Sequence, residues 1–362
     1  MKFFNTGLFL SAIFTVSNAD SRFNGLNYNP KRDANGCPSL DDVKSDLNVL
    51  SKYTDTLRIY STVDCNAGEM LLKAIKGSPW KLYLGIWVGQ DDNSYNADKD
   101  EIIRLSKLYD LKSYVKGVVV GSEAIYRKER TAEQMASLVS DTKSTLGSNG
   151  LGSIKVTSSE TWPWYQTPLI NAVDFLFVHV FPFWEGKTIE ESSDVAFGHI
   201  YDLQKVAQGK KVVIAESGWP SAGDNYGASV ASLTNAQKYM SDFVCRASAE
   251  NIDYLYFSAI DAPWASTNNA SNVESHWGII LSDHKTPKFS GNNWFDCTSA
   301  PKKPSNSTST KTGSTQTSSS ASNTSSQDST VSSTLSSSAT ITPGIIVFVS
   351  TVVLSALASA IF

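Results

Sequence analysis

Apolar positions follow two different spacings along the first 297 residues of the chain. Short apolar runs with the length of strands recur eight times, and stretches with the spacing of amphipathic helices separate them. The predicted strands cover residues 23–28, 56–60, 81–87, 115–123, 154–159, 174–181, 211–216 and 254–261. Several runs lack polar alternation, which is typical of strands buried on both faces of a parallel sheet.

Helical spacing is clearest over residues 39–53, 98–108, 131–146 and 233–249. Ser39 stands before Asp41 and Asp42, as an N-cap does before acids in the first turn of a helix. Thr131 precedes Gln134 by three residues, which is the spacing of a reciprocal capping pair. Two of the predicted helices therefore have defined starting points.

Eight strands that alternate with helices over roughly 275 residues predict an α/β fold, the (β/α)₈ or TIM barrel. A doubly wound open sheet is the alternative. That fold usually places a glycine-rich phosphate loop after its first strand, and no such loop occurs here. The barrel is therefore the favoured architecture for residues 20–297.

Two of the predicted strands lead directly into a glutamate. VVIAE ends at Glu216, where Gly218 and Pro220 stop the strand, and VVVGS runs into Glu123. In a barrel the carboxyl ends of the strands form one face, so both side chains are expected in one cleft. Two carboxyl groups that flank one bond are the machinery of glycoside hydrolysis. Alternatively, each glutamate caps a helix or holds an ion pair.

Aromatic or polar residues stand at nearly every predicted strand end. Some are expected to close the top of the core, and others suit the apolar faces of sugar rings. The candidates for substrate binding are Tyr28, Tyr60, Trp87, Ser122, Trp162, Phe181, Trp219, Asp261 and Trp264. Trp219 and Trp264 are expected to line subsites and not the core. Glu160, close to Trp162, is a competing candidate for the acid.

Charge and cysteine content limit the partners and cofactors that the protein is expected to have. The net charge is −4 and no dense basic run occurs, which argues against nucleic acid as a partner. The four His residues are scattered and no cysteine pair has zinc-site spacing, so neither a metal nor another cofactor is expected. The chain has an even number of cysteines, Cys37, Cys65, Cys245 and Cys297, which predicts two disulfides. Three connectivities are possible, and proximity favours Cys37–Cys65 with Cys245–Cys297.

The two ends carry signals of export and anchoring. Residues 1–19 have the apolar run and small final residues of a secretory signal peptide. Residues 298–344 are rich in Ser and Thr, as in an O-glycosylated stalk, and 345–362 form an uncharged apolar tail. This tail resembles a glycosylphosphatidylinositol (GPI) signal that is removed, with attachment near Ser332; a retained transmembrane tail is the alternative. The sequons for N-glycosylation are Asn269, Asn306 and Asn323.

Three segments, IAESGWPS, VVVGSEAIYR and LRIYSTVDC, resemble family 17 of the glycoside hydrolases. More narrowly they are similar to its fungal cell-wall β-1,3-glucanases and glucanosyltransferases. The resemblance extends over the globular part and implies a retaining barrel enzyme acting on β-1,3-glucan, with Glu123 as acid/base and Glu216 as nucleophile. It also implies a location in the cell wall or on the outer face of the plasma membrane, because the fungal subgroup commonly bears a stalk and a lipid anchor. We expect a monomer.

The sequence departs from that family at two places. Many members have Asn before the acid/base, where this chain has Ser122. Many fungal relatives have Asp-Glu-x-Trp-Lys after the eighth strand, whereas Ala262 and Ala265 stand here at the Glu and Lys positions. The effect of those two charges on the carboxylate pair is therefore missing or is supplied by other residues.

The roles of the two glutamates predict different environments. Glu123 must hold a proton, which burial and the charge of Glu216 would favour by raising its pKa. Glu216 must stay ionised, and Tyr60 and the backbone near Ser217 are candidate donors. Two other functions remain open, a non-catalytic glucan-binding wall protein and a retaining hydrolase of another β-glycan. Sequence does not decide whether water or a sugar is the acceptor.

Overall fold

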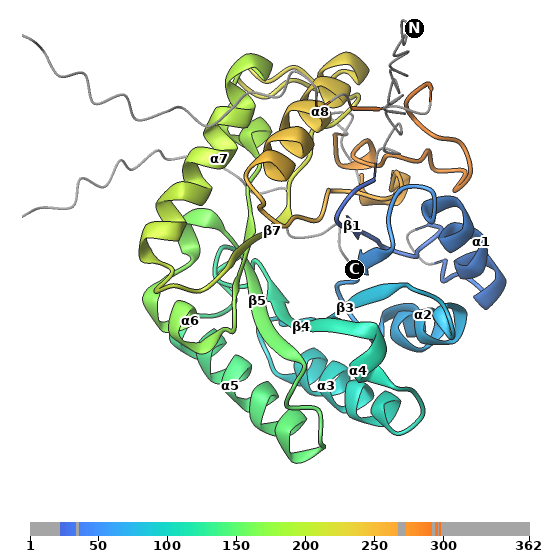
Figure 1. Ribbon diagram of the computed structural model, residues 1–362, viewed down its shortest axis with the longest axis vertical. Coiled ribbons are helices and arrows are strands. Elements are labelled where there is room, and N and C mark those ends of the chain that lie inside the picture. The colour runs from blue at the N-terminus through green and yellow to red at the C-terminus, as the bar shows by residue number, and fades with distance from the viewer. Residues whose placement is uncertain (1–21, 34–35, 267–272, 292–293, 296, 298–362) are drawn as a thin grey trace, which may run out of the picture. The chain divides into compact units, whose positions relative to one another are not determined.

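A computed structural model describes residues 22–33, 36–266, 273–291, 294–295 and 297. Its strands form one parallel sheet in which chain order equals sheet order, surrounded by helices (Figure 1). The strands are β1 (Leu26–Asn27), β2 (Thr56–Arg58), β3 (Lys81–Ile86), β4 (Val115–Ser122), β5 (Lys155–Thr161), β6 (Leu176–His179) and β7 (Val212–Glu216). This order is that of a barrel, and it excludes a doubly wound sheet, in which the strand order reverses.

The eighth predicted strand closes the barrel without forming a regular strand. Tyr254 forms a parallel bridge with Ile214 of β7, and Tyr256 forms one with Leu26 of β1. The amide of Asn27 donates to the Tyr256 carbonyl at 3.0 Å on the same edge. The prediction of a TIM barrel is thus confirmed, with seven regular strands and a bridging eighth segment in the described part of the chain.

Helices follow most of the strands. They are α1 (Leu40–Leu50), α2 (Ala67–Ile75), α3 (Asn93–Ser106), α4 (Leu111–Tyr114), α5 (Ala132–Ser148), α6 (Thr167–Ala172), α7 (Ile189–Val206) and α8 (Leu233–Ala249). The capping pairs predicted for α1 and α5 are both present: Ser39 with Asp42, and Thr131 with Gln134. Within the described ranges, no helix is both long and apolar enough to cross a membrane.

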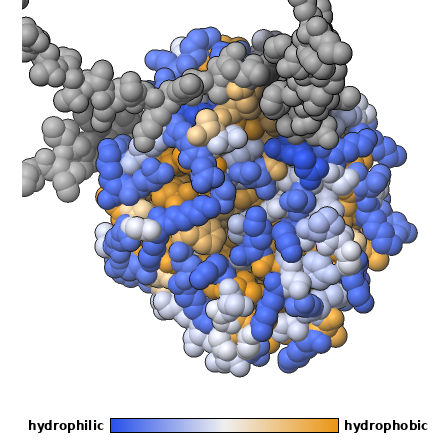
Figure 2. All heavy atoms as spheres, viewed as in Figure 1, coloured by the Kyte–Doolittle hydropathy of each residue, from blue (hydrophilic) through white to orange (hydrophobic). Residues whose placement is uncertain are grey.

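Apolar side chains fill two regions. One lies inside the barrel and includes Tyr83, Val119 and Phe177, and the other lies between the strands and the helices. The rim of the face seen in Figure 2 is mostly hydrophilic. A closely packed interior of this kind gives the strand ends fixed positions.

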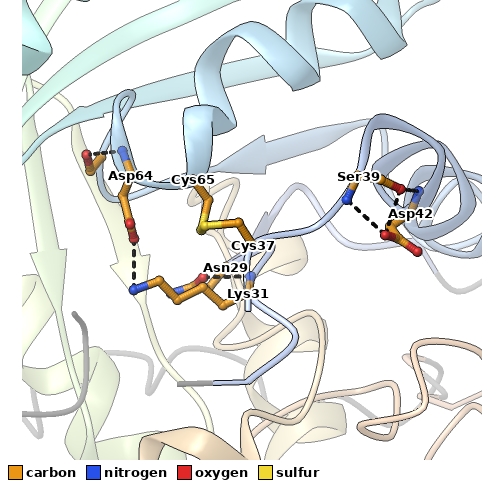
Figure 3. Close-up of a disulfide and its surroundings, with 8 residues drawn as sticks. Asn29, Lys31, Cys37, Ser39, Asp42, Asp64 and Cys65 are labelled. Atoms are coloured by element: carbon orange, nitrogen blue, oxygen red, sulfur yellow. Dashed lines mark hydrogen bonds and ion pairs between the residues drawn. A yellow bond between two sulfur atoms is a disulfide. The ribbon is translucent and has the colours of Figure 1, made fainter. Parts of the chain in front are cut away.

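Both predicted disulfides are confirmed. Cys37–Cys65 joins the loops that follow β1 and β2 (Figure 3), and Cys245–Cys297 joins α8 to the end of the barrel domain. The predicted signal peptide, stalk and tail lie outside the described residues. So do the predicted attachment residue Ser332 and the three sequons.

Candidate active site

Glu216 and Glu123 occupy the strand ends where they were expected. Glu216 is the last residue of β7, and Glu123 follows β4 directly. The Glu216 residue is 6% exposed, and the Glu123 side chain is 17% exposed. The backbone of Glu123 is left-handed, with φ of 59°, which is uncommon for a residue other than glycine and occurs preferentially at functional sites.

One histidine links the two carboxyl groups. His179, the last residue of β6, is 1% exposed. Its Nδ1 lies 2.7 Å from Oε1 of Glu123, and its Nε2 lies 3.2 Å from Oε1 of Glu216. The two carboxyl groups therefore contact opposite nitrogens of one imidazole ring.

An arginine at the end of β2 holds the other side of Glu216. Arg58 is 1% exposed and forms an ion pair with Oε1 of Glu216. The same guanidinium donates to Oδ1 of Asn27 at 3.2 Å, to Oγ of Ser122 at 3.1 Å and to Oγ of Ser159 at 2.7 Å. Since these partners come from β1, β4 and β5, one side chain of β2 links three other strands to the carboxylate on β7.

The environment of Glu123 differs from the prediction. Burial does raise its pKa, but the hydrogen bond and the charge of His179, with the charges of Arg127 and Arg58, outweigh burial. The pKa of Glu123 therefore lies below its usual value in the free protein. The expected increase is wrong because an unforeseen base stands next to the carboxyl group.

Other charges surround the pair. Burial raises the pKa of Glu274, in the turn Val273–Ser275, to about 7, and the negative charges of Glu123 and Glu216 add to this effect. Burial also raises the pKa of Tyr60 well above its usual value, and the charge of Glu216 contributes. Glu274 is thus a third carboxyl group, whose pKa depends on the charges of Glu123 and Glu216.

Other polar contacts lie around the two departures from the family pattern. Ser122 is 4% exposed and accepts a hydrogen bond from Arg58, so it belongs to the network that holds Glu216. Lys288 forms a buried ion pair with Asp261 at 2.5 Å, and Asp261 also accepts from the amide of Gly278. The lysine in contact with Asp261 is therefore Lys288, whereas position 265 is an alanine.

The carboxyl group of Glu160, the competing candidate for the acid, binds backbone amides. It is fully buried and accepts hydrogen bonds from the amides of Ile125 at 2.8 Å and Tyr126 at 3.4 Å. Burial raises its pKa to about 8, and the charge of Glu123 contributes. Glu160 therefore supports the turn after Glu123, and its carboxyl group is directed at backbone amides.

The prediction that Trp219 lines a subsite is wrong. Its side chain is 1% exposed, its indole N–H donates to the carbonyl of Val230 at 2.9 Å, and it packs against Phe183 and Tyr239. Strand-end position alone could not distinguish this core residue from one in the cleft. Tyr28 is also buried, at 1% exposed, and its hydroxyl donates to Asp46 at 2.6 Å, so this hydroxyl is not available to a sugar.

The remaining aromatic candidates are more accessible or lie beside a hollow. Trp162 is half-buried and stacks on His199 with ring centroids 3.9 Å apart. Phe181 and Trp264 are also half-buried. Tyr60 and Trp87 help to line an open hollow of about 330 Å³ at the ends of β1, β2 and β3.

The rim of this hollow is fixed by an ion pair and a disulfide. Asp64 lines the hollow, and Lys31 reaches it across 3.2 Å, next to Cys37–Cys65 (Figure 3). The Lys31 ammonium group also lies 5.9 Å from the ring centroid of Trp264. This edge of the site is therefore covalently and electrostatically fixed.

Sequence reasoning missed four residues of the site, Arg58, His179, Ser159 and Glu274. The only available signal was position: Arg58 and His179 are polar residues inside otherwise apolar strand runs. Such residues are expensive to bury without partners, so each indicates a buried polar network. In the described residues, no cluster of three or more His, Cys, Asp or Glu side chains is arranged to hold a metal ion.

Comparison with known proteins identifies relatives of the whole barrel. The glucan 1,3-beta-glucosidase of Saccharomyces cerevisiae is 30% identical over 292 residues, which are 75% of this chain and 92% of that protein. The probable glucan endo-1,3-beta-glucosidase btgC of Aspergillus terreus is 32% identical over 273 residues, covering 67% of this chain and 40% of that protein.

A solved structure extends this similarity to three dimensions. The glycoside hydrolase family 17 β-1,3-glucanosyltransferase from Rhizomucor miehei is 34% identical with a TM-score of 0.68, over 74% of this chain and 97% of that chain. The family model of the BtgE/BtgC glycoside hydrolase domain matches residues 25–278, which include Glu123, His179 and Glu216. The chain therefore belongs to the BtgE/BtgC glycoside hydrolase family.

Proposed function

We propose that the protein cleaves β-1,3-glucan by a retaining mechanism, with Glu123 as general acid/base and Glu216 as nucleophile. The observation that carries this proposal is the pair of strand-end carboxyl groups bridged by His179. Glycosidases need one carboxyl group that protonates the leaving oxygen and a second that attacks or stabilises the anomeric carbon. The substrate class is supported by the relatives, which are named for β-1,3-glucan.

The surroundings of Glu216 suit a nucleophile, and the exposure of Glu123 suits a group that exchanges protons. Arg58 provides a permanent positive charge beside Glu216 and orients its carboxylate toward the cleft through a fixed set of partners. Glu123 is more exposed than Glu216, as a group that exchanges protons with a leaving group must be. In the first step Glu216 forms an ester to the anomeric carbon while Glu123 gives its proton to the departing oxygen.

In the second step Glu123 takes a proton from the acceptor, whose oxygen displaces the ester and restores Glu216. Water as acceptor gives hydrolysis, and a sugar hydroxyl gives a new glucan linkage. The 34% identity to a β-1,3-glucanosyltransferase favours transfer as a second activity of the same site. Half-buried aromatic residues such as Trp162 and Phe181 are candidates to bind the acceptor.

Two variants test the roles separately. Glu216→Gln should abolish turnover of every substrate, because no covalent intermediate can form. Glu123→Gln should still release an activated leaving group such as dinitrophenol, and added azide should restore part of its turnover by replacing the base-activated acceptor. Glu160→Gln is the matched control, since the same chemical change is made at a buried carboxyl group outside the cleft. Full activity of Glu123→Gln on gluco-oligosaccharides would contradict the assignment.

Product analysis on β-1,3-gluco-oligosaccharides of defined length tests substrate and acceptor together. Products longer than the starting oligosaccharide identify transfer, and shorter products alone identify hydrolysis. Binding without any product would instead indicate a non-catalytic glucan-binding protein. Turnover confined to another β-glycan would indicate a different hydrolase.

The proposal extends to where the protein works. Residues 1–19 would direct export, and residues 345–362 would be exchanged for a lipid anchor near Ser332 at the end of a glycosylated stalk. The barrel domain would then act in the cell wall or at the outer face of the plasma membrane. A stop codon in place of position 345 should release the protein into the medium, and retention of that truncated form would count against the anchor.

A further inference from the structure

His179 lies between the two carboxyl groups, where its ring can hold a proton as well as separate them. Both of its ring nitrogens face carboxyl oxygens, at 2.7 Å from Glu123 and 3.2 Å from Glu216. A neutral imidazole carries one N–H, so it can donate to only one of two carboxylates. The arrangement is therefore satisfied only when one further proton is present.

The position of that further proton follows from the role of Glu216. A nucleophile must be ionised, so Nε2 of His179 donates its N–H to Glu216. The second proton then lies between Nδ1 and Glu123. When it is on Glu123, this carboxyl group is a general acid that donates to a neutral imidazole; when it is on Nδ1, an imidazolium ion faces an ionised Glu123.

We propose that His179 is the positioning residue of the general acid/base, sharing with Glu123 the single proton that is given to the leaving sugar and regained from the acceptor. The inference rests on the roles proposed above for Glu123 and Glu216. During glycosyl transfer the shared proton leaves with the departing oxygen as the bond to Glu216 forms. The lone pair of Nδ1 then faces an ionised Glu123, which favours uptake of a proton from the acceptor as the ester breaks.

The charges around His179 are consistent with a shared proton. Oε1 of Glu216, from β7, lies 3.2 Å from Nε2, and Nη1 of Arg58, from β2, lies 3.5 Å from the same nitrogen. Around Glu123, Arg127 favours the ionised carboxylate, whereas the nearby Glu274 favours the protonated acid. Charges of both signs therefore surround the imidazole ring and the Glu123 carboxyl group, which titrate as a coupled pair.

The test uses His179→Asn, which keeps a small polar side chain but cannot carry the proton. Dinitrophenyl β-laminaritrioside needs no acid to lose its leaving group, whereas a β-1,3-gluco-oligosaccharide does. Cleavage of laminaripentaose should fall on the order of 100-fold, the usual contribution of general acid catalysis. The burst of dinitrophenol should fall much less, because it loses only the hydrogen bond from Nε2 to Glu216. Azide should accelerate steady-state turnover of the dinitrophenyl substrate in the variant.

The pH profile gives a second readout. A proton that can rest on either of two bases is held more tightly than on one of them. The alkaline limb of kcat/KM for laminaripentaose should therefore move to lower pH by about one unit in His179→Asn. Ser159→Ala is the matched control, because it removes a 2.7 Å hydrogen bond to Arg58 at the same end of the barrel without touching Glu123. Ser159→Ala should slow turnover of both substrates by the same factor and leave the alkaline limb of kcat/KM at the same pH.

Equal losses on both substrates in His179→Asn, with an unchanged alkaline limb, would overturn the inference and leave His179 a structural spacer. If Glu123→Gln behaves as proposed while this happens, only the inference fails. If Glu123→Gln is fully active on laminaripentaose, the proposed function fails as well. Should His179→Asn not fold, as judged by circular dichroism, His179→Gln provides the same comparison with a longer amide.

Discussion

Replacing Arg58 by methionine tests whether one guanidinium group holds the nucleophile in place. Methionine is about as long but has no charge, so Glu216 would keep a buried charge without its ion-pair partner. Three further hydrogen bonds, to Asn27, Ser122 and Ser159, would be lost at the same time. Breaking a buried ion pair from one side destabilises a protein by about 3–5 kcal/mol.

The assay is thermal unfolding of four proteins: wild type, Arg58→Met, Glu216→Gln and the double variant. At 2–4 °C per kcal/mol for a domain of this size, Arg58→Met should lower the melting temperature by roughly 10 °C. Glu216→Gln removes the unpaired charge, so the double variant should be more stable than Arg58→Met alone by about 1 kcal/mol or more. Arg58→Lys should lie between wild type and Arg58→Met, because it keeps the charge but not the fork of donors.

The reasoning is refuted if Arg58→Met melts within about 2 °C of wild type, which corresponds to less than 1 kcal/mol. It is also refuted if the double variant is less stable than Arg58→Met. In the first case the ion pair would contribute little, and in the second the charge on Glu216 would be held by other groups. Either result would require a different account of how Glu216 stays ionised.

Four other predictions concern features outside this ion pair. Replacing Cys37 and Cys65 by Ala opens a loop of 28 residues and should destabilise the protein by about 3.5 kcal/mol, measured by denaturant unfolding. Because burial raises the pKa of Glu160 from 4.5 to about 8, the fold favours its protonated form, so wild-type stability should fall as pH rises through that range; melting curves of Glu160→Gln should lack this component. Trp219→Ala should cost about 3–5 kcal/mol of stability, as for other buried aromatic residues. Trp162→Ala should instead raise KM for long glucans with little change in melting temperature.

The barrel could be predicted because strand periodicity is a local property. Runs such as VVIAE need only their own apolar residues to be recognised, and the capping pair at Ser39 marks the start of α1. The helix α2 was missed because its N-cap, Asn66, is left-handed and makes no side-chain capping bond. The eighth strand was predicted as regular, although only bridges at Tyr254 and Tyr256 form.

The site was predictable only where strand order fixes it. Glu123 and Glu216 were found because each ends a buried strand. His179 and Arg58 were not, since their significance depends on which strand ends meet in space, and they lie 121 residues apart in the chain. Trp219 was placed wrongly for the same reason: a residue after a strand can turn into the cleft or into the core, and packing against Phe183 decides for the core.

The left-handed backbone at Glu123 has an evolutionary consequence. Glycine adopts this conformation without strain, whereas a residue with a Cβ is disfavoured there by roughly 1–2 kcal/mol. A single nucleotide change converts a glutamate codon into a glycine codon, and it would remove the acid/base while relieving that strain. The backbone conformation at this position therefore favours glycine over the residue to which we assign the acid/base role. Under the proposed mechanism, a barrel that binds glucan without cleaving it lies one nucleotide change away.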